Sequence, residues 1–479
     1  MKENKPILAA VSVFAAFTLS SCSVADYVGH LGLDETTAAT SPLYTTATPY
    51  RDTTVTTSET TFYQDGTEFG LIPVEIPQKP KNTPVAVKVA DGESVKISGE
   101  DVISKDSDVS GGVSKSRGKL TLEKSTLVSS SKSSDTFESR FFGTSAALLS
   151  MPSSNIAVSD SVVTTTGNGS AAAFAYGTGS VIDISNSEIS TLNANARALA
   201  ATYHGSIFAA GSKISTNGAN SPAVFIGTGK GTINVTGGEI STLGANSPAV
   251  YSEGTAALTG VKIKTASSEV AVVEGNNSVS LTGCNIETDA TTFTLYRSNS
   301  GETSKGLATL NIVGGSIESK SGAMFYAANT EAKICLQGVK INSNSTSLVN
   351  AVANEKWGNV GENGAKVTLV ANFQKLEGDI YADNLSEVTL DLSAMSEFTG
   401  TVNSRNTAKK ANVILDASSK WILRGNSFVS ALTPGMADFS NIEDNGYTIY
   451  YDADNPTNVY LNGETITLKN GGLLTPMTK

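Results

Sequence analysis

The strongest constraint on this chain is an internal repeat of about 25 residues. The segment Gly-Ala-Asn-Ser-Pro-Ala-Val occurs at positions 218–224 and recurs identically at 244–250, 26 residues later. Self-similarity at a fixed period of roughly 20 to 50 residues is the signature of repeat architectures. The repeat therefore limits the fold class before any single motif is considered.

A looser apolar template extends the repeat in both directions. Two apolar residues separated by one position are followed, five residues after the second, by a third apolar residue. In every repeat these first two residues, seven and five positions before the third, are Val, Ile, Leu or Ala. The third position is occupied by Val102, Leu127, Val163, Ile189, Ile214, Ile240, Ile263, Ile286, Ile317 and Ile341.

Such alternation predicts short strands, and no helical period accompanies it. Each repeat is therefore predicted to form one coil of a right-handed parallel β-helix, an all-β solenoid of about 13 coils over residues 83–432. Two polar insertions, 129–142 and 298–306, are expected to be loops. The aromatic-rich segment 433–479 is expected to cap the last coil, since unpaired terminal strands promote edge-to-edge association.

Charge and composition narrow the class of partner. Only 16% of residues are charged, and the abundant Ser, Thr, Gly and Asn have low helix propensity, which suits strands joined by tight turns. The net charge is −11 and the chain has no basic run. Nucleic acid is therefore not an expected partner.

Residues 1–21 are predicted to be an export signal. Lys2 and Lys5 precede a 13-residue apolar run, 7–19, which is too short to cross a bilayer comfortably. The run ends in Leu-Ser-Ser before Cys22 and resembles a bacterial lipobox, which implies that Cys22 becomes an acylated N-terminus. The alternative is an ordinary cleaved signal with an accidental cysteine.

This interpretation predicts an exported protein of the cell envelope, surface-exposed and anchored to a bacterial membrane by more than one acyl chain. Residues 22–82 are then a threonine-rich spacer and lead-in, with too little apolar surface to fold alone. The alternative is that this segment lies along the body and has no spacing role.

Several stretches of the coil region point to a known group of proteins: 197–203, the two Asn-Ser-Pro-Ala-Val segments, 268–275, 421–429 and 445–451. On these stretches the chain resembles a broad group of secreted, adhesin-like β-helix proteins of bacteria, within the pectate-lyase-like superfold. The resemblance covers about residue 83 to the C-terminus, and it implies the fold more specifically than any function.

One acidic pair falls on adjacent coils of the regular columns, namely Glu287 and Glu318. A calcium-dependent lyase needs stacked carboxylates for its metal, and a hydrolase needs a carboxylate pair. Because Lys264 precedes the pair in the same column, a solvated charge ladder is the plainer interpretation. We therefore predict no catalytic residue and no cofactor, with Glu287 and Glu318 as a weak metal-site candidate.

An aromatic row is the stronger candidate for ligand binding. Aligning the strands after the Asn-Ser-Pro turns gives an inner column and, one residue later, an outward one. The inner column is Val224, Val250, Val272, Leu295 and Met324, and the outward one is Phe225, Tyr251, Val273, Tyr296 and Phe325. Aromatic faces at coil spacing could form a strip for sugar rings or apolar surfaces. Alternatively, the row only packs across strands beneath an insertion or the N-terminal segment.

Three functional hypotheses follow. The first is an adhesin-like envelope protein that binds glycan or a host or matrix surface without catalysis. The second is a polysaccharide lyase or hydrolase on the same scaffold. The third is a structural envelope spacer with no specific ligand.

Overall fold

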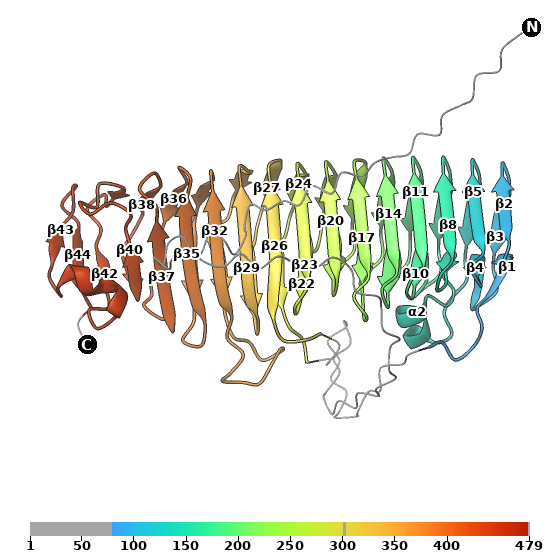
Figure 1. Cartoon of the computed structure of the whole chain (residues 1–479), viewed down its shortest axis with the longest axis horizontal. Coiled ribbons are helices and arrows are strands. Elements are labelled where there is room, and N and C mark those ends of the chain that lie inside the picture. The colour runs from blue at the N-terminus through green and yellow to red at the C-terminus, as the bar shows by residue number, and fades with distance from the viewer. Residues whose placement is uncertain (1–78, 300–302, 478–479) are drawn as a thin grey trace, which may run out of the picture. The chain divides into compact units, whose positions relative to one another are not determined.

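The computed structural model describes residues 79–299 and 303–477. These residues form an all-β, right-handed parallel solenoid of about 16 turns, which confirms the predicted fold class. Coils stack along one axis from β1 (Val85–Asp91) to β44 (Leu473–Pro476) (Figure 1). The expected number of coils, about 13, is too low, because parallel pairing continues through β41 (Ile442–Glu443), β42 (Ile449–Tyr451) and β44.

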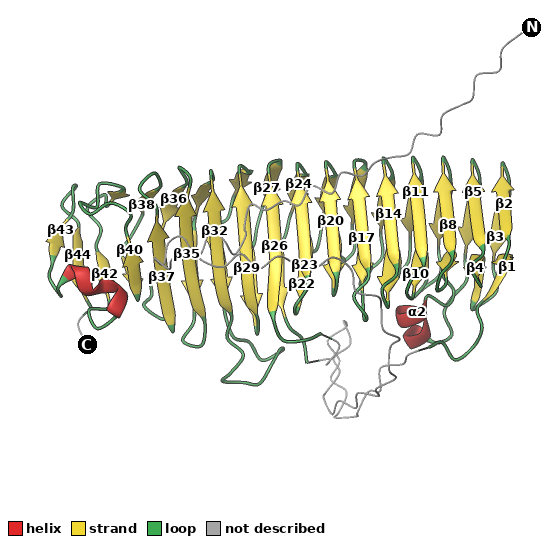
Figure 2. Ribbon diagram, viewed as in Figure 1, coloured by secondary structure: helices red, strands yellow, loops and turns green. Residues whose placement is uncertain are grey.

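Three long sheets, each taking one strand from successive coils, form the sides of the solenoid (Figure 2). Sheet I has 12 strands: β1 (Val85–Asp91), β4 (Val109–Lys115), β7 (Leu148–Ser150), β10 (Ala171–Tyr176), β13 (Arg197–Thr202), β16 (Val224–Ile226), β19 (Val250–Ser252), β22 (Ala271–Glu274), β25 (Phe293–Tyr296), β28 (Phe325–Ala328), β31 (Ser347–Ala351) and β34 (Asp379–Ala382).

Sheet II has 14 strands: β2 (Ser94–Ser98), β5 (Lys119–Glu123), β8 (Asn155–Ser159), β11 (Val181–Ser185), β14 (Ser206–Ala210), β17 (Thr232–Thr236), β20 (Thr255–Thr259), β23 (Ser278–Thr282), β26 (Leu307–Val313), β29 (Glu331–Gln337), β32 (Lys366–Asn372), β35 (Glu387–Ser393), β37 (Lys410–Leu415) and β40 (Ala431–Thr433).

Sheet III has ten strands: β3 (Asp101–Ser104), β6 (Thr126–Ser129), β9 (Val162–Thr165), β12 (Glu188–Thr191), β15 (Lys213–Thr216), β18 (Glu239–Thr242), β21 (Lys262–Thr265), β24 (Asn285–Thr288), β27 (Ser316–Ser319) and β30 (Lys340–Ser343).

Two smaller sheets complete the C-terminal coils. One contains β33 (Lys375–Glu377), β36 (Glu397–Gly400), β38 (Lys420–Leu423) and β41 (Ile442–Glu443). The other contains β39 (Ser427–Val429), β42 (Ile449–Tyr451), β44 (Leu473–Pro476) and β43 (Ile466–Thr467), and the 3-10 helix η1 (Pro456–Leu461) precedes β43. The last pair, β43 with β44, is antiparallel and ends the stack.

The predicted register is confirmed over ten coils. The column from Val102 to Ile341 pairs residue by residue through sheet III, and the two earlier columns do so through sheet II. All three columns are buried except Val95 and Ile341, which are half-buried. A slip of one residue would turn an entire column into solvent, so core burial specifies this register.

The corner between sheets II and III is a repeated left-handed residue. Ten successive coils have positive φ there: Gly99, Lys124, Asp160, Asn186, Gly211, Gly237, Gly260, Gly283, Gly314 and Gly338. Glycine adopts this conformation without steric cost, and asparagine and aspartate tolerate it better than most residues. Seven of the chain's 44 glycines therefore occupy the same turn in different coils.

The polarity of the first insertion, 129–142, predicts a loop, but the insertion is not simply a loop. It contains the helix α2 (Thr136–Phe142), which begins at the N-cap Asp135 and ends at Gly143 with φ of 70°. Phe141 and Phe142 on this helix are buried in a cluster with the outward side chains of sheet I. An aromatic pair within one helical turn outweighed the surrounding polar residues, because it could bury itself against the solenoid.

Candidate functional site

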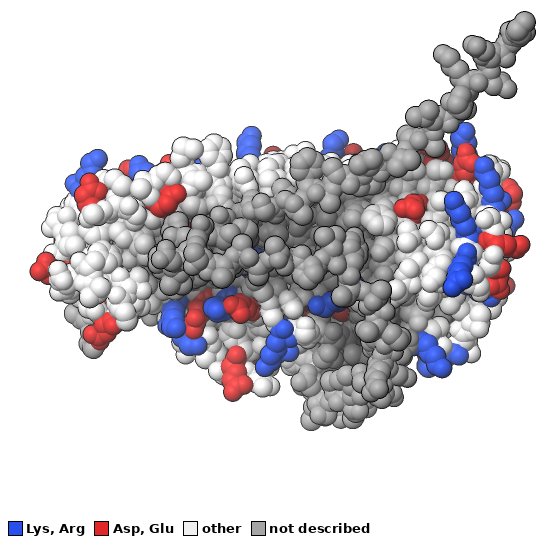
Figure 3. All heavy atoms as spheres, in the orientation of Figure 1, with Lys and Arg blue, Asp and Glu red and all other residues white. Residues whose placement is uncertain are grey.

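The outward face of sheet III is the more regular of two candidate surfaces. Glu188, Lys213, Glu239 and Lys262 pair on successive coils, so charges of opposite sign alternate as predicted. All four are exposed, and the Nζ of Lys262 lies 3.6 Å from a carboxylate oxygen of Glu239. Both signs are also mixed over the described surface visible in Figure 3.

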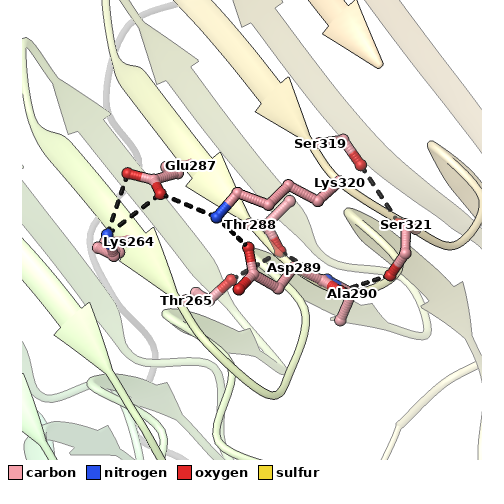
Figure 4. Close-up of polar contacts among 9 residues, drawn as sticks. All are labelled: Lys264, Thr265, Glu287, Thr288, Asp289, Ala290, Ser319, Lys320 and Ser321. Atoms are coloured by element: carbon pink, nitrogen blue, oxygen red, sulfur yellow. Dashed lines mark hydrogen bonds and ion pairs between the residues drawn. The ribbon is translucent and has the colours of Figure 1, made fainter. Parts of the chain in front are cut away.

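Glu287 and Glu318 lie side by side on β24 and β27, as their spacing predicted. Glu287 is held by lysines: Lys264 Nζ lies 3.1 Å and Lys320 Nζ 3.3 Å from its Oε1, and Lys320 also contacts Asp289 at 2.8 Å (Figure 4). Hydrogen bonds from Lys264 and Lys320 lower the pKa of Glu287. It is therefore ionised at neutral pH and poorly suited to act as a general acid.

No set of three His, Cys, Asp or Glu side chains arranged to hold a metal occurs in residues 79–299 and 303–477. Glu287 has two lysine partners, whereas Glu318 forms no ion pair within the described residues.

A groove with a volume of about 590 Å³ runs along this face. It crosses six strands, β12 to β27, which corresponds to about 24 Å at the usual strand spacing. Its lining combines four isoleucines, Ile214, Ile240, Ile263 and Ile286, with the polar residues Glu188, Lys213, Ser215, Glu239, Ser241, Lys262, Lys264, Asn285, Glu287, Ser316 and Glu318.

The outward face of sheet I is the second candidate surface, and the predicted aromatic row is partly wrong there. Phe225 and Tyr251 pair on adjacent coils and stack, with ring centroids 5.6 Å apart. The next residue in their row is Val272, not Val273, because β22 is aligned one residue earlier than expected. Val272 had been assigned to the interior.

The shifted alignment also relocates Tyr296 and Phe325. Tyr296 pairs with Glu274, two positions beyond the Phe225 row, which continues through Val272 and Thr294. Phe325 faces the interior, where it is fully buried and stacks on Phe293 at 5.6 Å. The outward row actually runs through Val113, Leu149, Phe174, Ala200, Phe225, Tyr251, Val272, Thr294, Tyr326, Asn350 and Tyr381.

The middle of this row is enclosed. Phe225 and Tyr251 are only 2% and 7% exposed. Phe142 of α2 packs on Tyr203 at 5.7 Å and edge-on against Tyr176 at 5.1 Å, so the helix covers one end. At the other end, Trp357 stacks on Tyr296 at 4.0 Å.

A hydrogen-bonded acidic and phenolic network lies under this cover. The Tyr251 hydroxyl donates to Glu274 and lies 3.3 Å from the Tyr296 hydroxyl. The other oxygen of Glu274 accepts the Ser298 backbone N–H at 3.2 Å. Burial, with the nearby Glu274 carboxylate, raises the pKa of both tyrosines well above 10. Tyr296 as a whole is half-buried.

Two arginines join the same cluster. Arg197, at the start of β13, is 7% exposed, and its guanidinium lies 4.7 Å from the centre of the Phe225 ring. Burial, followed by repulsion from Arg140, lowers the pKa of Arg197 to about 9, so the group remains charged at neutral pH. Arg140 of α2 lies 3.8 Å from Glu253, which is 3% exposed.

Sequence reasoning missed this cluster of Arg140, Arg197, Glu253 and Glu274. The acidic pair had a signal, since Glu253-Gly and Glu274-Gly both lie at the end of a strand of sheet I on successive coils. The arginines had none, because Arg140 reaches the site only through the packing of α2.

Comparison with protein-family models, curated proteins and solved structures finds no match for this chain. Cys22, the predicted signal peptide and nearly all of the spacer lie outside the described residues. Among the described residues, no helix has the length and apolar character needed to cross a bilayer.

Proposed function

We propose that this chain is an adhesin-like protein of the cell envelope, anchored through lipid on Cys22, that binds glycan without catalysis. The observation that carries the proposal is the polar groove along sheet III. The groove is long relative to its volume, which favours an extended polymer over a compact ligand.

The chemistry of the lining supports a polyhydroxylated ligand. Each coil contributes a charged side chain or a hydroxyl group in register, including Ser215 and Ser241 beside Lys213 and Glu239. Carboxylates accept and ammonium groups donate hydrogen bonds, while serine hydroxyls do both, so hydroxyl groups of a sugar find partners at every step. The mixture of both signs also argues against a strongly anionic or cationic polymer.

The groove replaces the aromatic row as the proposed glycan surface. Phe225 and Tyr251 are too enclosed to offer a flat stacking face, and Phe325 points into the core. Phe225, Tyr251 and Tyr296 remain part of the second candidate surface, with roles in packing and in the buried network, whereas Phe325 packs in the core.

The test is glycan-array binding by the purified chain and by Ser241→Trp. Ser241 faces outward in the groove, so an indole there should block a polymer that lies along the groove and abolish its binding. The matched control is Asn234→Trp, at an outward position of sheet II in the same coil. Absence of binding by the wild-type chain, or equal binding by both variants, would refute the proposal.

A separate assay addresses the enzymatic alternative. Polygalacturonate and related polymers are incubated with the chain, with and without calcium, and product formation is followed. We expect no turnover, because the lysines hold Glu287 ionised. Turnover that Glu287→Gln abolishes would favour a lyase or hydrolase instead.

A further inference from the structure

A pocket opens to solvent over the last coils of the solenoid, and it shares no lining residue with the groove of sheet III. We call it the terminal pocket; Asn406, Phe428, Asp452 and Met477 are among its lining residues. It lies beside β42 and β44, at the C-terminal end of the stack (Figure 1). Its volume is about 300 Å³, the lower end of the range for small-molecule sites, so it suits one compact molecule and not a polymer.

One part of the lining is a row of residues at the ends of three adjacent strands. Ser430, Asp452 and Met477 directly follow β39, β42 and β44, and the last residues of these strands are paired in register. At the usual strand spacing the row spans about 10 Å, which is close to the width of one sugar ring with its hydroxyl groups.

A second part of the lining is the turn 403–408, which Asn403 holds in place. The Asn403 residue is 4% exposed, and its Oδ1 accepts the backbone N–H groups of Thr407 at 2.9 Å and Ala408 at 3.0 Å. Its Nδ2 donates to the Phe428 carbonyl at 3.3 Å, which ties the turn to β39. The pocket is therefore shaped before a ligand arrives, which lowers the cost of binding.

The lining combines apolar surface with groups that form hydrogen bonds. Phe428 and Met477, both half-buried, contribute apolar surface. Oδ1 of Asp452 accepts the Asp454 N–H at 3.0 Å, while its other carboxylate oxygen accepts no hydrogen bond within the described residues. The exposed Asn406 adds an amide, which both donates and accepts. A sugar ring has C–H groups on its faces and hydroxyl groups around its edge, so both parts would find partners.

The charges of the lining narrow the ligand further. Asp452 and Asp454 line the pocket, and no lysine or arginine does. A carboxylate or phosphate ligand would therefore be repelled. The described residues also contain no set of three side chains arranged to hold a metal.

We propose that the terminal pocket binds one neutral sugar unit, such as the unit at the end of a glycan chain. The site is separate from the groove of sheet III and does not depend on polymer binding there.

The test is saturation-transfer NMR of the full chain with glucose, galactose, mannose and N-acetylglucosamine, followed by titration of any sugar that binds. Glucuronate and glucosamine are the charged counterparts of glucose. We expect at least one neutral sugar to bind and glucuronate not to bind. Binding of glucosamine alone would mean that the aspartates form a cation site, and it would overturn the proposal.

The variant Asn406→Gly removes the amide without straining the turn, because Asn406 has a φ of 52°, which glycine adopts freely. Affinity for the sugar should fall about threefold to tenfold, the loss typical of one hydrogen bond. Asn462→Gly is the matched control, since Asn462 is exposed, has a φ of 50° and lies outside the pocket. This control should bind within about twofold of wild type.

A second variant, Ala453→Trp, places an indole at an exposed lining residue and should abolish sugar binding. Ala437→Trp makes the same change at an exposed residue outside the pocket and should bind normally. Ser241→Trp, which blocks the groove, should also leave binding of the single sugar unchanged. The proposal fails if no neutral sugar binds, if Ser241→Trp abolishes that binding, or if folded Asn406→Gly or Ala453→Trp binds like wild type.

Discussion

The outward faces of sheets I and III follow the same coil repeat but have opposite environments. On sheet III the outward side chains are charged or hydroxylic and largely exposed, and their register continues unbroken through ten strands. On sheet I the corresponding positions between α2 and Trp357 are mostly apolar, with several aromatic rings, and enclosed. The repeat thus determines which side chains point outward, whereas the insertions determine which of them remain in solvent.

The largest expected effect on the free energy of unfolding comes from the packing of α2 on the outward face of sheet I. Phe142→Ala removes a fully buried ring that packs on Tyr176 and Tyr203, so the free energy of unfolding should fall by about 3–5 kcal/mol. Phe208→Ala, at an outward position of sheet II that is 37% exposed, should cost about 1 kcal/mol or less. Urea unfolding followed by circular dichroism measures both; equal losses would show that α2 does not stabilise sheet I.

A smaller loss in the free energy of unfolding is expected from the hydrogen-bonded network of Tyr251, Glu274 and Tyr296. Tyr251→Phe removes the hydroxyl that donates to the buried Glu274 carboxylate, so unfolding should become easier by about 1.5–3 kcal/mol. The control is Tyr450→Phe, whose ring stacks on Phe428 at 4.6 Å and whose hydroxyl makes no hydrogen bond within the described residues. A loss at Tyr251 no greater than at Tyr450 would argue against a buried, charged Glu274.

The inner side of sheet III offers a finer comparison between two threonines of one row. The Thr265 hydroxyl donates to Thr288 at 2.8 Å, while the buried Thr242 hydroxyl has no partner among the described residues. Thr265→Val should therefore destabilise the chain by about 1 kcal/mol, and Thr242→Val should be neutral or slightly stabilising. The same urea titration checks the order of the two variants, and the reverse order would contradict the assigned hydrogen bond.

The smallest effect concerns the exposed ion pairs of sheet III. The pKa of Glu287 is lowered by Lys264 and Lys320, so its contribution to stability is present above the ordinary value of 4.5 and is lost as pH falls through the lowered pKa. Glu287→Gln should flatten the dependence of the melting temperature on pH in that acidic range.

This difference should vanish near 1 M NaCl, where screening removes interactions between exposed charges. The control is Glu318→Gln, which alters the next residue of the row and no ion pair within the described residues. A pH profile of Glu287→Gln that coincides with wild type at low salt would show that the lysine contacts contribute nothing.

The regular part of the fold could be predicted from the sequence because each coil repeats one physical requirement. The columns through Ile189, Ile214 and Ile240 predicted register correctly, since only one alignment buries them all. The alignment failed at Val272 and Phe325, where sheet I buries residues on both faces. Alternation between apolar and polar residues disappears there, and with it the signal that distinguishes inside from outside.

The sequence by itself determined that the chain coils, the number of residues in each coil and the charge rows of sheet III. These features depend on local alternation and on a period that every repeat shares. Only the tertiary structure decided that α2 folds over sheet I and that Arg140, Arg197, Glu253 and Glu274 meet. Those side chains come from the insertion and from three different strands or their ends. Their proximity results from packing between segments distant in sequence, which no periodic pattern encodes.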